Sequence, residues 1–159
     1  MPHKHCIEVL LDLEDTGVKI LDKPILKELG PQGIRKMIPA ILSPTVDVCP
    51  RCGTVGGDII KHGTKTSHIK VHKVTECDTY LLLKKQRYLC KDCSSTFTAT
   101  TKLVERSCFI AKPVKTAILL KARNIMSEKD IAKEVGVSHD QGVKLPDSSP
   151  DPSCLLSRD

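Results

Sequence analysis

The chain has 159 residues, which suggests one domain or two small modules with a modest hydrophobic core. Its net charge of +6 comes from a basic central part, with eight Lys and Arg against three Asp and Glu in 61–93 and eight against four in 94–134. Such a distribution is typical of a phosphate-backbone binder or of a solvated face, while the apolar runs are too short for a signal peptide or a membrane span and exclude those classes.

The eight cysteines are not read as a disulfide framework. We expect a bacterial cytoplasmic protein, whose thiols stay reduced. Aromatic residues make up only 3% of the chain, so few large rings are available to fill the core. A structural metal would supply part of the missing stability.

Residues 1–43 are predicted to form a small α/β lead-in. The segment "HCIEVLLDL" predicts a short helix, "VKIL" a strand, and "KMIPAILS" a second strand that Pro39 weakens. The breakers "LGPQG" predict a turn or loop between the two strands. No chemistry is assigned to this part.

Residues 44–104 hold two Cys-x-x-Cys pairs, each next to a predicted strand. In "HIKVHKV" the apolar Ile69 and Val71 alternate with Lys70 and His72, which indicates a strand. A second strand, "TYLLLKKQRYLC", ends directly in the second pair. Two strands that lead to or from Cys-x-x-Cys turns are the framework of a zinc ribbon.

The two pairs offer four soft ligands for a tetrahedral Zn²⁺: Cys49, Cys52, Cys90 and Cys93. In such a turn the amide groups point at the sulfurs, and a Gly after the second Cys accepts a positive φ. Gly53 fits this role, whereas Ser94 takes its place in the second pair and is less favourable. Iron in the same cage stays an alternative. A redox pair is less favoured because neither pair lies between a strand and a long helix.

The remaining cysteines and the central histidines are not predicted as ligands. The cysteines are interpreted as core or incidental thiols, and the histidines as surface or nucleic-acid-facing residues: Cys6, Cys77, Cys108, Cys154, His62, His68 and His72.

Residues 105–140 are predicted to be helical. In "KPVKTAILLKARN" apolar residues recur four apart, with Pro113 in the first turn. In "MSEKDIAKEVGVS" the pattern predicts Ser127 as N-cap, Ile131 and Ala132 facing inward, and Gly136 ending the helix. This is the first half of a helix-turn-helix, with an ordinary helical hairpin as the alternative.

Four segments, in this order, are similar to the N-terminal region of insertion-sequence transposases of the ISL-three type: "CPRCG", "IIKHGTKTSHIK", "LKKQRYLCKDCSSTFTA" and "SEKDIAKEVGVS". The resemblance covers roughly Cys6 to His139. It implies a zinc finger, then a helix-turn-helix, then a catalytic domain with an acidic metal-binding triad. It also implies DNA, the insertion-sequence ends, as partner. Self-association is left open.

The chain departs from that family after "GVS", where a recognition helix is expected. The segment "HDQGVKLPDSSPDPSCLLSRD" has three Pro and no helical period, and 141–159 is predicted to be a disordered tail. We therefore expect an α+β, zinc-dependent DNA-binding fragment of a transposase, truncated before the catalytic domain and without enzymatic activity. The alternative is a zinc-ribbon module that binds RNA or a protein partner.

Basic residues of the central part are predicted to contact DNA phosphates, which position a protein without reading bases. They are Lys61, Lys65, Lys70, Lys73, Lys84, Lys85 and Arg87.

Overall fold

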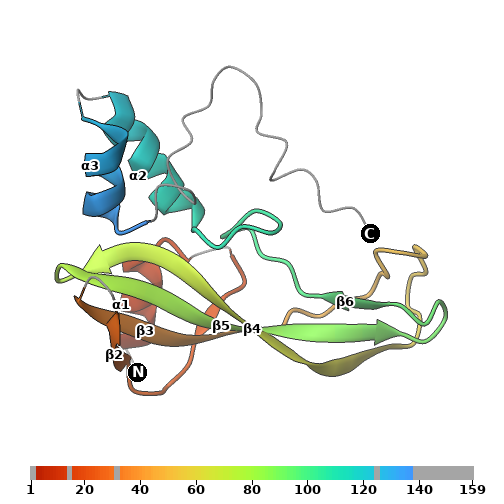
Figure 1. Cartoon of the computed structure of the whole chain (residues 1–159). Helices are drawn as coiled ribbons and strands as arrows, with labels where there is room; N and C mark the ends of the chain where they lie inside the picture. The colour runs from red at the N-terminus through yellow and green to blue at the C-terminus, as the bar shows by residue number, and fades with distance from the viewer. Residues whose placement is uncertain (1–2, 14–15, 31–32, 124–125, 138–159) are drawn as a thin grey trace.

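The structure is a computed structural model that describes residues 3–13, 16–30, 33–123 and 126–137. Within these ranges the elements are, in chain order, α1 (His3–Leu10), β1 (Lys19–Ile20), β2 (Leu26–Gly30), β3 (Gly33–Leu42), β4 (Ile59–Val74), β5 (Cys77–Cys90), β6 (Thr96–Thr98), α2 (Lys112–Arg123) and α3 (Glu128–Val135). The predicted α+β class is confirmed (Figure 1). The predicted tail and the position of a recognition helix lie outside the described residues.

The strands form one sheet with the order β1-β3-β5-β4, in which β2 also pairs with β3 and β6 with β5. The long antiparallel hairpin of β4 and β5, called the ribbon below, reaches from the helices at one end to the cysteine turns at the other (Figure 1). Strand β3 pairs with β5 in parallel, so the lead-in and the ribbon share the sheet. The division into 1–43, 44–104, 105–140 and 141–159 remains a prediction from the sequence.

The lead-in contains one strand that the sequence pattern did not predict. The side chains of β2 are almost all exposed, so its sequence shows no alternation of buried and exposed residues. The strand forms because it pairs with β3 in an antiparallel register. Pro39, expected to weaken its strand, lies inside β3. The Pro39 carbonyl accepts a hydrogen bond from the Leu21 amide, on the side of β3 that faces β1 and β2. The N and C=O groups of one strand residue point to the same side, so the missing N–H of Pro39 also points away from β5. No bond to β5 is lost there.

One face of the sheet carries the hydrophobic core. The register places side chains of β3, β4 and β5 on the same face, and segments after α1 and before α2 add to them. The sheet contributes Ile38, Ala40, Leu42, Ile69, Val71, Leu81 and Leu83, and the covering segments contribute Leu11, Leu13, Leu103, Val104 and Ile110.

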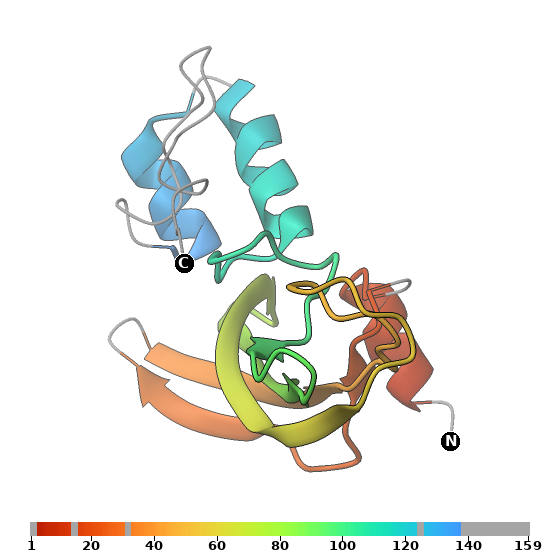
Figure 2. The same ribbon diagram turned by 90° about the vertical axis from the view of Figure 1, so that its right-hand side faces the viewer.

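The two C-terminal helices pack beside the end of the ribbon that is remote from the cysteines (Figures 1 and 2). In α3 the Ser127 hydroxyl accepts a hydrogen bond from the Asp130 amide at 3.2 Å, and Gly136 ends the helix with a φ of +73°. Ile131 and Ala132 are buried, and Pro113 stands in the first turn of α2. The predicted helix starts and stops are confirmed at these positions.

No helix among the described residues combines the length and the apolar character that crossing a membrane requires.

Candidate metal centre

The first cysteine turn connects the sheet to the start of β4. An isolated bridge between Val48 and Val55 closes its base. Inside it, the Cys49 amide donates to the Thr54 carbonyl at 3.1 Å and the Gly53 amide to the Cys49 carbonyl at 2.9 Å. These bonds fold the chain back tightly enough to bring both cysteines of the pair to one side.

The second turn repeats this geometry between β5 and β6. The Cys90 amide donates to the Ser95 carbonyl at 3.0 Å, the same five-residue spacing as in the first turn. The residue after the second cysteine is left-handed in both turns, Gly53 with a φ of +73° and Ser94 with +54°. The sequence prediction that this position needs a positive φ is therefore confirmed, and Ser94 adopts it without the freedom of glycine.

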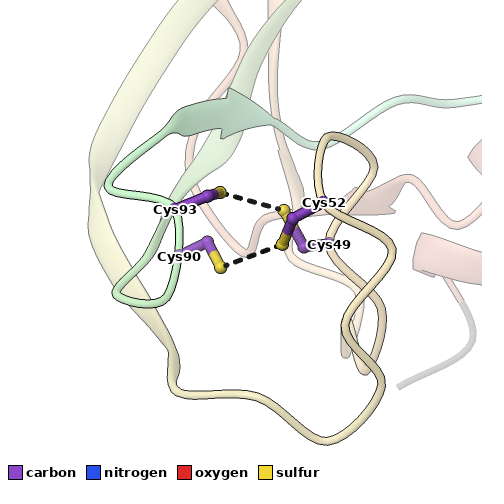
Figure 3. Close-up of side chains that lie close together, drawn as sticks. All are labelled: Cys49, Cys52, Cys90 and Cys93. Carbon is purple, nitrogen blue, oxygen red and sulfur yellow. Dashed lines mark hydrogen bonds between the residues drawn. The ribbon is translucent and has the colours of Figure 1, made fainter.

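The two turns bring four sulfurs together (Figure 3). All four lie within 4.8 Å of one another, with 3.7 Å between Cys49 and Cys93 and 3.8 Å between Cys52 and Cys90. Four sulfurs about 2.3 Å from a tetrahedral zinc stand about 3.8 Å apart, while a disulfide needs about 2.05 Å. The four cysteines are placed to bind a metal ion.

Burial divides the four cysteines in the same way in both turns. Cys49 and Cys90, the first of each pair, are buried, while Cys52 and Cys93 are exposed. In β5 and β6, the strands on either side of the second turn, the rings of Tyr88 and Phe97 stack with centroids 5.5 Å apart. The metal centre would thus be anchored on its sheet side and open to solvent on the other.

Hydroxyl groups face the exposed sulfurs. The Thr54 hydroxyl lies 3.2 Å from the Cys52 sulfur and the Ser95 hydroxyl 2.7 Å from the Cys93 sulfur. Hydrogen bonding to Thr54 lowers the pKa of Cys52 to about 6, and hydrogen bonding to Ser95 lowers the pKa of Cys93. Both hydroxyls therefore favour the thiolate form that binds metals.

The buried thiol of Cys90 behaves differently in the absence of a cation. Hydrogen bonding to the Cys93 backbone lowers its pKa, but burial and neighbouring thiols outweigh this and raise the pKa to about 12. Four thiolates cannot share this space without a positive charge, which a divalent ion would supply.

Sequence reasoning missed the two hydroxyls. The signal was present, because "CGT" and "CSS" both place a hydroxyl residue two positions after the second cysteine. The remaining cysteines and the histidines do not join the cluster among the described residues: Cys6, His62 and His68 are exposed, and Cys77, Cys108 and His72 are half-buried. Cys154 lies outside the described residues.

Residues 45–93 match the family model described as the zinc-finger of transposase IS204/IS1001/IS1096/IS1165. This segment is therefore similar to the zinc ribbon of ISL-three type transposases. The match contains all four cysteines and the whole ribbon, so the resemblance found in the sequence is confirmed over these residues. No curated protein and no solved structure matched the chain.

The basic residues of the ribbon fall into three sets. The register places Lys65 opposite Lys85, with Arg87 two positions further on the same face. Lys84 and Lys61 lie on the other face, opposite Thr66 and Tyr88.

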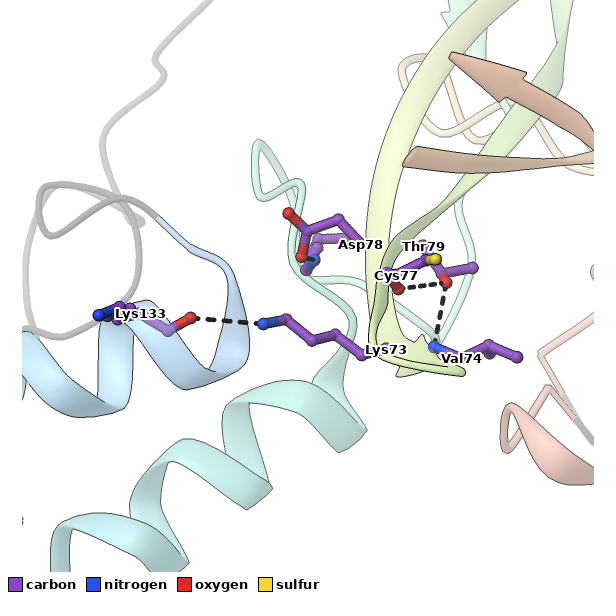
Figure 4. A network of polar contacts seen from close by, with 7 residues as sticks. Lys73, Val74, Cys77, Asp78, Thr79 and Lys133 are labelled. Atoms are coloured by element: carbon purple, nitrogen blue, oxygen red, sulfur yellow. Dashed lines mark hydrogen bonds and ion pairs between the residues drawn. The ribbon is translucent and has the colours of Figure 1, made fainter. Parts of the chain in front are cut away.

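The third set, Lys70 and Lys73, lies at the helical end of the ribbon. Lys73 donates from Nζ to the Lys133 carbonyl of α3 at 3.3 Å (Figure 4). Lys70 is only 3% exposed, and its Nζ is 2.6 Å from Oδ1 of Asp78. The prediction of Lys70 as a phosphate contact does not fit this burial, because its ammonium group is already paired inside the protein.

Proposed function

We propose that this chain is a zinc-dependent DNA-binding module that binds insertion-sequence ends. The observation that carries the proposal is the cluster of four sulfurs, all within 4.8 Å of one another, in the segment that matches a transposase zinc finger. In this proposal one Zn²⁺ is bound by the four cysteines Cys49, Cys52, Cys90 and Cys93. The ion fixes the two cysteine turns and, through them, the end of the ribbon next to these turns.

Zinc is preferred over iron because the family model is that of a zinc finger. Both metals accept a tetrathiolate cage, so the geometry alone does not separate them. A colourless protein with about one zinc per chain supports zinc. A coloured protein with iron in its place contradicts it.

DNA is the partner that the charge of the ribbon favours. Exposed and half-buried Lys and Arg side chains project from β4 and β5. Helix α2 follows, and then α3, which in this proposal is the first helix of a helix-turn-helix. Phosphate contacts by such side chains give affinity without much base specificity. The role that we propose is binding, with no catalytic step in this chain.

The test is a titration of the zinc-loaded chain with duplex DNA at several salt concentrations. Affinity should fall as salt rises, with a log–log slope of about −0.9 for each phosphate contacted. The second candidate function is an RNA-binding zinc ribbon. Equal or tighter binding to single-stranded RNA of the same length would support that candidate, and binding independent of salt would contradict both.

A further inference from the structure

Two lysines of the ribbon face each other with the same charge. Lys65 and Lys85 are direct partners in the antiparallel register of β4 and β5. Like charges at directly opposed positions destabilise a sheet. Burial lowers the pKa of Lys85, and the nearby charge of Lys65 lowers it further. In the protein without a ligand, the repulsion between Lys65 and Lys85 therefore lowers the stability of the sheet.

Arg87 adds a third positive charge to the same side. It lies two residues after Lys85 on β5, and its side chain is half-buried, as is that of Lys85. No carboxylate in 3–13, 16–30, 33–123 or 126–137 forms an ion pair with any of these three residues. Lys65, Lys85 and Arg87, called the basic face below, thus have no counter-charge among the described side chains.

The backbone beside the basic face is open. Lys61 pairs with Tyr88 and Thr64 with Gln86, so a bulge of two residues stands opposite Arg87. One of the two is Gly63, which has a φ of +78° and no atom within 4 Å of the place where a Cβ would be. A glycine inside a strand often marks a bulge or a site that a ligand approaches closely.

We infer that the basic face is the phosphate-binding site of the ribbon, and that the backbone of duplex DNA occupies it. The inference rests on the DNA-binding function proposed above and narrows it to one side of the sheet. A phosphodiester between Lys65 and Lys85 supplies the missing counter-charge and removes their repulsion. Lys84, one residue away, faces Thr66 on the opposite side and has no such lysine partner.

The adjacent lysines give a matched pair of variants. Lys85→Glu and Lys84→Glu change the net charge equally, so a difference between them reports the face and not the total charge. At about 0.15 M salt the Debye length is about 8 Å, which limits the long-range part of either change. Lys65→Glu is a second variant of the basic face, at an exposed position that does not disturb packing.

The measurements are the affinity for one duplex DNA and the melting temperature of each free, zinc-loaded variant. We expect Lys85→Glu and Lys65→Glu to weaken DNA binding at least tenfold, while Lys84→Glu weakens it less than about threefold. Because each basic-face variant replaces a repulsive pair by an attractive one, its melting temperature should not fall and should rise by a few degrees. A side chain with a purely structural role would not combine gained stability with lost binding.

Equal losses for Lys84→Glu and Lys85→Glu, with DNA binding by the unchanged chain, overturn the assignment of the face and leave the proposed function standing. A larger loss for Lys84→Glu places the site on the other side and also overturns it. If the unchanged chain does not bind duplex DNA at all, the proposed function and this inference both fail. If Lys85→Glu does not fold, the Lys65→Glu result decides.

Discussion

The ammonium group of Lys70 lies 2.6 Å from Oδ1 of Asp78, and the two side chains are 4% and 10% exposed. The same ammonium stands 4.9 Å from the centre of the Tyr80 ring. A Cβ built on the left-handed Gly136, which ends α3, would stand 2.0 Å from the same Oδ1 of Asp78. Figure 4 shows Asp78 between the ribbon and the end of α3. This buried pair therefore joins the ribbon to the helical part of the chain.

Asp78→Asn should lower the free energy of unfolding by about 3 kcal/mol, because it leaves a buried ammonium without its counter-charge. Urea unfolding of the zinc-loaded protein measures the loss. The control is Asp58→Asn, which breaks the ion pair between Asp58 and Lys91. This pair lies at the surface, with the Lys91 side chain 54% exposed and the Asp58 side chain 74% exposed. That change should cost less than about 1 kcal/mol. Equal losses would contradict a special role of the buried pair.

The loss in Asp78→Asn should also depend on pH. Burial lowers the pKa of Lys70, and Asp78 counteracts this, so removing the carboxylate lowers that pKa further. The unfolded chain, in which a lysine titrates near about 10.4, then binds more protons than the folded variant. Its free energy of unfolding therefore rises with pH below about 10.4, and the deficit should be smaller at about pH 9.5 than at about pH 7. A deficit that is constant between these pH values would contradict this.

Gly136→Ala should destabilise the protein more than a positive φ alone explains. A Cβ at this position would stand 2.0 Å from Oδ1 of Asp78, in addition to the strain of a φ of +73°. Gly63→Ala is the matched control, since its φ is +78° and the space around it is empty. We expect about 1 kcal/mol for the control and at least twice that for Gly136→Ala in thermal unfolding. Similar losses would show that the contact between Gly136 and Asp78 is unimportant.

The parts that the sequence predicts correctly are those with a local signature. The Cys-x-x-Cys spacing, the positive φ after each second cysteine, and the Ser127 and Gly136 helix boundaries all depend on neighbouring residues. Each of these signals lies within a few consecutive residues and does not depend on contacts with distant parts of the chain.

The parts that it misses depend on distant contacts. β2 has no alternation to recognise, and it forms because β3 pairs with it. The alternation of Lys70 with the buried Ile69 predicts that Lys70 faces solvent. In the structure it meets Asp78 across the hairpin, next to Gly136 of the α3 terminus, 66 positions along the chain. A pattern within one strand cannot reveal that both of its faces are covered.

Cys90→Ser should abolish stable metal binding. The purified chain should hold about one zinc, whose binding free energy is part of the folding free energy, so the variant should lose zinc and melt at a lower temperature. Elemental analysis and thermal unfolding with and without chelator measure both effects. Cys77→Ser is the control, because Cys77 is half-buried and outside the sulfur cluster. Stoichiometric zinc in Cys90→Ser would contradict the tetrathiolate site.

Ser94→Gly should stabilise the second cysteine turn. Ser94 is exposed and has a φ of +54°, a conformation that costs a residue with a Cβ about 1–2 kcal/mol. Glycine removes this strain but gives the unfolded chain more freedom, which costs about 0.4–1 kcal/mol. The net gain should be about 0.5–1 kcal/mol in the free energy of unfolding of the zinc-loaded protein.

The reciprocal change, Gly53→Ser in the first turn, should lose a similar amount, because Cys49 donates to Thr54 as Cys90 donates to Ser95 and the φ of Gly53 is +73°. Both variants keep the four cysteines, so their zinc content should stay at that of the unchanged chain and stability alone should respond. Urea unfolding at fixed free zinc separates the two effects. A Ser94→Gly protein that is less stable, or a Gly53→Ser protein that is more stable, would show that the two turns are not equivalent in energy.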